Sequence, residues 1–128
     1  MSSDLYQEEI LDHYRHPHNH GTLENPDATF EDSNPLCGDI VAVDLRYDGE
    51  RVSEVRFRGS GCAISQAAAS MLTDMVVGQT RVDALAIPRE AILEELGVPL
   101  SPARVKCALL GYKVMMAALY GVPDHNAK

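Results

Sequence analysis

An alternation of apolar and polar residues predicts a β-hairpin near the middle of the chain. Between residues 41 and 47 every second residue is Val, Leu or Tyr, which is the period of a strand with one buried face. Asp48-Gly49 follows as a tight-turn dipeptide, and Val55 and Phe57 continue the pattern beyond it. Gly59-Ser60-Gly61 comes next, and because glycine weakens a strand, we expect the hairpin to end there in a turn.

Helical spacing of apolar residues dominates the rest of the chain. It predicts helices from about residue 4 to 15 and from 63 to 77, the second ended by Gly78. Thr80 and Pro88 introduce two short helices, and Ser101-Pro102 starts a long one that runs to Gly121. One further strand near residues 28–31 fits the breaker-rich segment before the hairpin. The pattern predicts an α+β fold with segregated layers, as one domain over residues 1–128.

The composition of the chain limits which partners and which cellular compartment are expected. The chain has 19 acidic and 11 basic residues, a formal net charge of -8, which repels nucleic-acid phosphates and anionic membranes. The N-terminal segment lacks the basic start and apolar core of a secretory signal, and no apolar run is long enough to span a bilayer. We therefore expect a cytoplasmic protein that binds neither nucleic acid nor membrane. In that reducing compartment the three cysteines are expected to be metal ligands, reactive thiols or buried residues rather than disulfides.

Four potential ligands stand at the ends of predicted elements. Cys37 and Asp39 precede the first hairpin strand, Cys62 follows the second, and Cys107 lies in the opening turns of the last helix. Pairing of the hairpin strands brings Cys37 and Asp39 close to Cys62. Three thiolates and a carboxylate supply the four donors of a site for zinc, ferrous iron or an iron–sulfur cluster. Asp39 is a harder donor than sulfur, which favours release of a soft metal or cluster, and Lys106 beside Cys107 offsets negative charge.

Simpler interpretations apply to each feature taken alone. A single cysteine is more often a buried apolar residue, and Asp39 after Gly38 is more often a turn residue. The glycines at 59 and 61 lack the full pattern of a nucleotide-binding loop. Four histidines, His13, His16, His18 and His20, could form a metal cluster, but Pro17 and Asn19 between them favour a solvated loop outside the site.

Four ordered segments give the chain a family resemblance between Tyr6 and Tyr120. They are Ile10-Leu11-Asp12-His13-Tyr14 with His16-Pro17 and Asn19, Asn34-Pro35-Leu36-Cys37-Gly38-Asp39, Phe57-Arg58-Gly59-Ser60-Gly61-Cys62-Ala63-Ile64-Ser65, and Arg104-Val105-Lys106-Cys107. With these segments the chain resembles the U-type iron–sulfur scaffold proteins (IscU, SufU and the N-terminal domain of NifU). The resemblance implies a three-stranded antiparallel sheet packed against several helices.

The resemblance also implies a site and a set of partners. Cys37, Asp39, Cys62 and Cys107 would take zinc or iron, or assemble a transient [2Fe-2S] cluster. A cysteine desulfurase would supply sulfur, and the completed cluster would pass to apo iron–sulfur proteins or carrier proteins. The implied role is that of a scaffold or sulfur acceptor rather than an enzyme.

Two branches of the family remain open for this chain. Lys106 stands where IscU proteins have a histidine, as in SufU proteins, which act as zinc-dependent sulfur acceptors that stimulate their desulfurase. The short spacing from Cys62 to Cys107 is similar to that of IscU. The SufU resemblance indicates Cys37 as the first sulfur acceptor, and the IscU resemblance indicates Cys107. The segment Leu100-Ser101-Pro102-Ala103-Arg104 keeps little of the motif that docks a dedicated chaperone in IscU, so such a chaperone is not expected.

Overall fold

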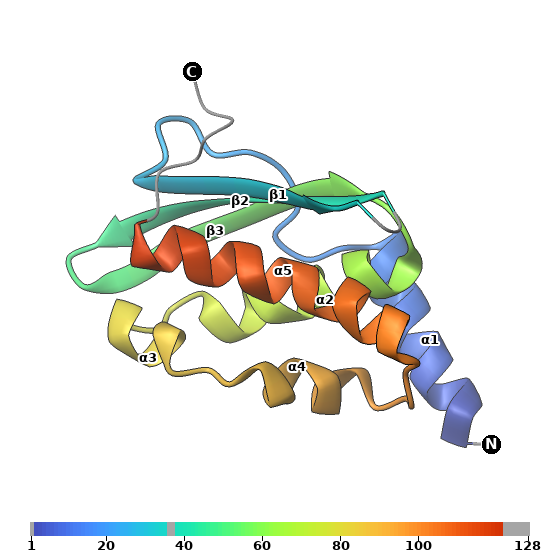
Figure 1. The fold of residues 1–128 in the computed structure, drawn as a ribbon. Helices are drawn as coiled ribbons and strands as arrows, with labels where there is room; N and C mark the ends of the chain where they lie inside the picture. Colours follow the sequence, from blue (N-terminus) through green and yellow to red (C-terminus); the bar gives the residue numbers. More distant parts are fainter. Residues whose placement is uncertain (1, 36–37, 122–128) are drawn as a thin grey trace.

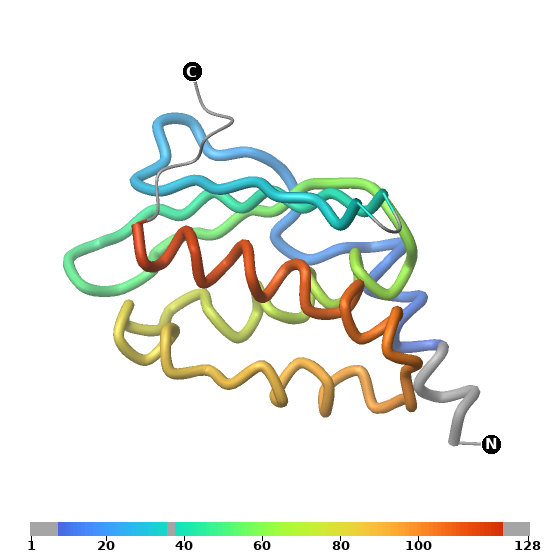
Figure 2. The backbone as a smooth tube through the Cα atoms, in the orientation of Figure 1, coloured from blue at the N-terminus to red at the C-terminus, as the bar shows by residue number. Residues whose placement is uncertain are grey.

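The computed structural model describes residues 2–35 and 38–121 and has the expected α+β architecture. A three-stranded antiparallel sheet forms one layer, and helices cover one of its faces (Figures 1 and 2). The elements are α1 (Ser2–Arg15), β1 (Ala28–Asn34), β2 (Asp39–Asp48), β3 (Arg51–Ser60), α2 (Ala63–Val76), α3 (Arg81–Leu85), α4 (Arg89–Leu96) and α5 (Pro102–Tyr120). In the described part of the chain, no helix combines the length and apolar character needed to cross a bilayer.

The sheet has the order β1-β2-β3, with the predicted hairpin formed by β2 and β3. The turn is Gly49-Glu50, one residue later than the predicted Asp48-Gly49, because Asp48 still pairs with Arg51. The prediction that the hairpin ends before Gly59 was wrong, because β3 continues to Ser60, which pairs with Ile40. A Cβ atom on Gly59 would overlap the carbonyl oxygen of Ile40 and lie 2.9 Å from its carbon. Glycine is needed here for the close approach of two strands, so it extends the pairing instead of ending it.

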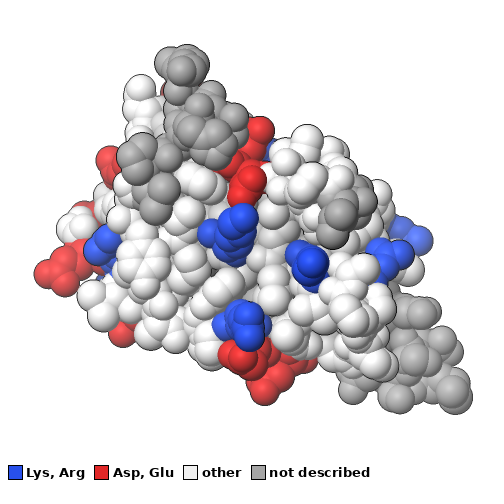
Figure 3. Space-filling model, in the orientation of Figure 1, with Lys and Arg blue, Asp and Glu red and all other residues white. Residues whose placement is uncertain are grey.

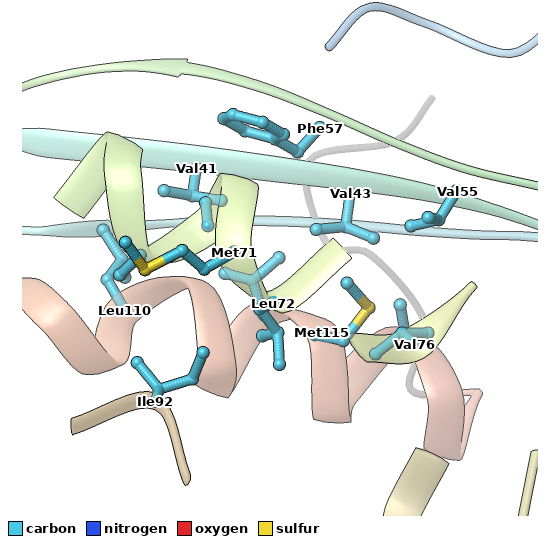
Figure 4. Close-up of a cluster of buried hydrophobic side chains, with 14 of the residues drawn as sticks. Val41, Val43, Val55, Phe57, Met71, Leu72, Val76, Ile92, Leu110 and Met115 are labelled. Carbon is cyan, nitrogen blue, oxygen red and sulfur yellow. The ribbon is translucent and has the colours of Figure 1, made fainter. Parts of the chain in front are cut away.

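The core lies between the sheet and the two long helices. Helices α2 and α5 pack against each other and against the sheet, and α4 lies on their far side (Figure 1). Figure 4 shows the buried side chains that fill this space, among them Val41, Val43, Val55, Met71, Leu72, Val76, Leu110 and Met115. Ile92 extends the buried cluster from α4 on the far side of the two helices. Gly111 allows the close packing of α5 on α2, since a Cβ atom there would lie 3.2 Å from the Cβ of Ala69.

Local caps set where the helices begin and end. The hydroxyl of Ser101 accepts a hydrogen bond from the backbone N–H of Arg104 at 3.4 Å, and α5 starts at the following proline, as predicted. Thr80 caps α3 by accepting from the N–H of Asp83 at 3.1 Å. Pro88 is the N-cap of α4 instead of its first helical residue, a shift of one position. Ser101 and Pro102 therefore determine where α5 starts, and with it the helical turn in which Cys107 lies.

Candidate metal centre

Three of the four expected ligands meet at one end of the sheet. Asp39 is the first residue of β2, Cys62 follows β3 and is the N-cap of α2, and Cys107 lies in the second turn of α5. These element ends lie together at the right of Figure 1. One potential ligand atom from each residue lies within 4.8 Å of the other two. The fourth expected ligand, Cys37, falls outside the described residues.

Asp39 is tied directly to Cys62. Its side chain is buried, with 1% of the residue exposed, and its Oδ1 accepts a hydrogen bond from the backbone N–H of Cys62 at 2.9 Å. The other oxygen, Oδ2, lies 3.5 Å from the Cys62 sulfur, within reach of the thiol hydrogen. The carboxylate is thus held in position by the residue next to which it would bind a metal.

Gly61 makes this contact sterically feasible. Its φ is +140°, and a Cβ atom there would overlap Asp39 Oδ1 and lie 2.7 Å from Asp39 Cγ. Only glycine fits both the backbone angle and the space. From sequence, Gly61 was interpreted as a turn residue; its position immediately before Cys62 is the signal that connects it with the site.

The cysteine sulfurs border an open pocket of about 420 Å³. Asp39, Cys62 and Cys107 contribute to its wall together with Arg104 and Lys106 of α5. Cys107 itself is buried, with 4% of the residue exposed, whereas Cys62 is partly exposed. The pocket is large enough for a metal ion or a small inorganic cluster and one approaching side chain.

Positive charge surrounds these anionic donors. Cys62 is the N-cap of α2, so its sulfur lies next to the positive end of the dipole of that helix, which favours a thiolate there. Arg104 and Lys106 add two cations at the pocket wall. On the face that α5 presents, basic and acidic side chains are otherwise interspersed (Figure 3), as in the ion pair of Lys113 with Asp32 at 2.9 Å. This electrostatic setting lowers the cost of gathering thiolates and a carboxylate.

The donor set fits soft or borderline transition metals. Two thiols and one carboxylate are present among the described residues, and sulfur ligands select zinc, iron and iron–sulfur clusters over magnesium or calcium. A metal bound between sulfur at about 2.3 Å and oxygen at about 2.1 Å separates those two atoms by about 3.6 Å in a tetrahedral site. The observed 3.5 Å between Cys62 Sγ and Asp39 Oδ2 matches this spacing.

The fold and this site define a small α+β protein with a cysteine and aspartate pocket at one end of the sheet, whose donors suit a metal ion or an iron–sulfur cluster. The chain belongs to the NifU-like N terminal domain family, whose model matches residues 5–128. It is 33% identical to the iron–sulfur cluster assembly scaffold protein IscU of Streptococcus pyogenes, over 90% of this chain and 82% of that protein.

Other relatives carry a second kind of name. The chain is 36% identical to the zinc-dependent sulfurtransferase SufU of Bacillus subtilis, over 87% of this chain and 86% of that protein. A crystal structure assigned to a SUF-system cluster assembly scaffold (FiSufU) of Fervidobacterium islandicum AW-1 superimposes with a TM-score of 0.78 at 32% identity, covering 93% of this chain and 99% of the other. The family is therefore established, and the resemblance extends to both of its branches.

Proposed function

We propose that this chain is an assembly scaffold for iron–sulfur clusters, with Cys37, Asp39, Cys62 and Cys107 as the ligands of the nascent cluster. In this function the chain receives sulfur from a cysteine desulfurase, builds a [2Fe-2S] unit and passes it to apo-proteins or carrier proteins. The observation that carries the proposal is the convergence of Asp39, Cys62 and Cys107 within 4.8 Å at a pocket open to solvent. Relatives of similar length named as scaffolds support it.

Sulfur delivery follows from thiolate chemistry. A thiolate of this chain attacks the outer sulfur of a persulfide on the desulfurase, forming a new S–S bond while the desulfurase cysteine leaves as a thiolate. The transfer is redox-neutral. Cys37 and Cys107 are the candidate first acceptors, and because Cys107 is 4% exposed, sulfur would reach it through the pocket.

Cluster formation then needs iron and electrons. Two sulfane sulfurs take up four electrons in becoming sulfide, and two ferrous ions release one electron each in becoming ferric. The remaining two electrons must come from an external reductant, an electron-transfer protein or a dithiol. The residues of this chain hold the sulfurs, accept the iron and exclude bulk water from one side of the product.

Asp39 has a specific part in this proposal. It is the single oxygen donor of the set, and its Oδ1 is already engaged by the Cys62 N–H at 2.9 Å. Oxygen binds iron–sulfur units less firmly than thiolate does, so this ligand would be the first to yield to an incoming acceptor. Replacing Asp39 should therefore lengthen the lifetime of the cluster.

A second function rests on Lys106. This residue precedes Cys107 and lines the pocket, and the chain is 36% identical to a zinc-dependent sulfurtransferase. In this alternative zinc occupies the same four ligands, and the chain acts as a zinc-dependent acceptor that relays persulfide sulfur and stimulates its desulfurase.

Anaerobic reconstitution distinguishes the two functions. The purified chain is incubated with ferrous iron, cysteine, a desulfurase and a dithiol, and visible absorption and bound metal are followed for the wild type, Asp39→Ala and Asp48→Ala. Asp48 is the matched control, because it is an exposed aspartate at the opposite end of the same strand. The scaffold predicts a visible chromophore in all three proteins, transferred to an apo-ferredoxin more slowly from Asp39→Ala than from the other two.

The contrary results are equally clear. The sulfur-acceptor function would be supported over the scaffold if zinc persists through reconstitution, no chromophore forms and the desulfurase rate rises when the chain is added. Loss of structure on chelation with neither activity would reduce the site to structural zinc.

A further inference from the structure

A second group of potential metal ligands lies far from the cysteine pocket. It consists of His13 near the end of α1, His18 in the following loop and Asp74 near the end of α2, and one ligand atom from each lies within 4.8 Å of the other two. Asp74 follows Cys62 by 12 residues along α2, which corresponds to about 18 Å at the helical rise. From the sequence, a metal cluster of histidines is one interpretation of this segment and a solvated loop is the favoured one. Asp74 could not be added from sequence, because it is distant in the chain.

The cluster is held in place by hydrogen bonds. His18 Nδ1 lies 2.6 Å from Asp74 Oδ2, and the imidazole rings of His13 and His18 have centroids 4.4 Å apart. The loop that carries His18 is fixed to α2, because Asn19 Nδ2 donates to Thr73 Oγ1 at 3.0 Å and to Asp74 Oδ1 at 3.2 Å. Little loop entropy is therefore lost when these side chains bind a ligand.

A serine hydroxyl supports both histidines. Ser70 Oγ accepts a hydrogen bond from the backbone N–H of His18 at 2.8 Å and lies 2.8 Å from His13 Nδ1. A hydroxyl oxygen has two acceptor sites, so it can also accept from His13 Nδ1–H. That arrangement leaves the lone pair of His13 on Nε2, the usual way in which a protein orients an imidazole for a metal.

From these contacts we propose that His13, His18 and Asp74 form a second metal site, which binds one divalent transition ion independently of the cysteine pocket. Two imidazoles and a carboxylate are the borderline donor set preferred by Zn²⁺, Fe²⁺ and Co²⁺. Nitrogen and oxygen ligands around such an ion lie about 3.4 Å apart, so the present spacing closes with side-chain movements of about 1 Å. The set contains no thiolate and therefore suits a single ion rather than a sulfide-bridged cluster.

Space for further ligands lies next to the three residues. A shallow pocket of about 150 Å³ is lined by His13 and Asp74 together with Met71, Met75 and Glu95. It can hold a water molecule as the fourth ligand, with the Glu95 carboxylate on its wall. The site is partly solvent-exposed, since the side chains of His18 and Asp74 are each 46% exposed, so an ion can enter without rearrangement of the fold.

The test uses zinc and an untagged chain in which Cys37, Cys62 and Cys107 are replaced by serine. Isothermal titration and elemental analysis at pH 7.5 should give one zinc per chain, with a dissociation constant on the order of 10 μM or below. Adding His18→Gln or Asp74→Asn should weaken zinc binding at least tenfold. His16→Gln is the matched control, an exposed histidine of the same loop region outside the cluster, and should leave binding unchanged.

Circular dichroism verifies that each variant is folded. Should the triple-serine chain fail to fold, the same count is made in the wild type, where two zinc ions per chain should fall to one in His18→Gln. The proposal is overturned if the chain binds no zinc, if His18→Gln and Asp74→Asn bind zinc as tightly as the parent chain, or if His16→Gln weakens binding as much as they do. These contacts would then only hold the loop against α2. Neither result bears on the cysteine pocket.

Discussion

Replacing Gly61 by alanine perturbs the candidate metal centre without replacing any of its proposed ligands. Gly61 has a φ of +140°, and a Cβ atom there would lie 2.7 Å from Asp39 Cγ and 3.0 Å from Asp39 Cα. The added methyl group must therefore displace the carboxylate or the backbone that carries Cys62. Either movement separates the two groups that now lie 2.9 Å apart.

The expected magnitude has two parts. A non-glycine residue at this φ costs about 1–3 kcal/mol in backbone strain. Loss of the hydrogen bond from the Cys62 N–H to the Asp39 carboxylate costs about 1.5–3 kcal/mol more. Gly21 separates these parts, because its φ is +137° and an added Cβ would meet only Arg56 Cδ, at 4.0 Å. Gly21→Ala should therefore lose about 1–3 kcal/mol, and Gly61→Ala about 2.5–6 kcal/mol.

Urea unfolding of the metal-free proteins measures these losses, and competition with a chromophoric chelator measures zinc affinity. Gly61→Ala should bind zinc at least tenfold more weakly than the wild type, whereas Gly21→Ala should bind it equally well. Equal stability losses in the two variants, together with unchanged zinc affinity, would show that the Asp39 contact does not shape the site.

Two further predictions concern stability away from the pocket. Asp44 is 1% exposed and accepts hydrogen bonds from Thr29 Oγ1 at 2.8 Å and Arg58 Nη1 at 3.0 Å. Asp44→Ala should cost about 3–5 kcal/mol in urea unfolding, whereas the exposed Asp48→Ala should cost less than about 0.5 kcal/mol; similar losses would refute the role of this network. Burial raises the pKa of Tyr112 above its ordinary value of 10.0. Just above pH 10, the phenol therefore keeps its proton in the folded state after the unfolded state has lost it. This contribution to stability is present below about pH 10 and is lost as the pH rises through the folded pKa. The free energy of unfolding should therefore fall more steeply above about pH 10 in the wild type than in Tyr112→Phe. Identical slopes of this free energy against pH would contradict the prediction.

The sequence predicts the parts of this molecule that depend on local rules. The period-two run and the Asp48-Gly49 turn specify the hairpin, and its antiparallel pairing alone brings Asp39 near Cys62. The Ser101 cap specifies the start of α5 in the same way. Each of these predictions rests on residues close together in the chain, where spacing determines geometry.

Features that depend on distant contacts could not be predicted in this way. The approach of Cys107 to Cys62 requires α5 to pack on α2, which Gly111 allows by meeting Ala69. From the residues alone, Cys107 joins the set because a tetrahedral site needs four donors, and the family resemblance agrees; neither the hairpin nor any local spacing brings it close to Cys62. The need for glycine at position 61 likewise comes partly from Asp39, on the neighbouring strand, so a local rule predicts the turn there but not the contact with Asp39.

In the proposed site, the hydrogen bond from the Cys62 N–H to Asp39 would allow one ligand to be firmly placed yet weakly bound. Oδ1 of Asp39 is held by the Cys62 N–H, which leaves Oδ2 as a single oxygen 3.5 Å from the cysteine sulfur. A carboxylate that already shares its charge with a backbone donor gives less of it to a metal, and one oxygen binds less firmly than two. In the proposed function, the backbone would thus pre-position Asp39 for assembly and at the same time weaken its bond to a metal. For a scaffold that both builds and releases its cargo, the first effect of this hydrogen bond would favour assembly and the second would favour release.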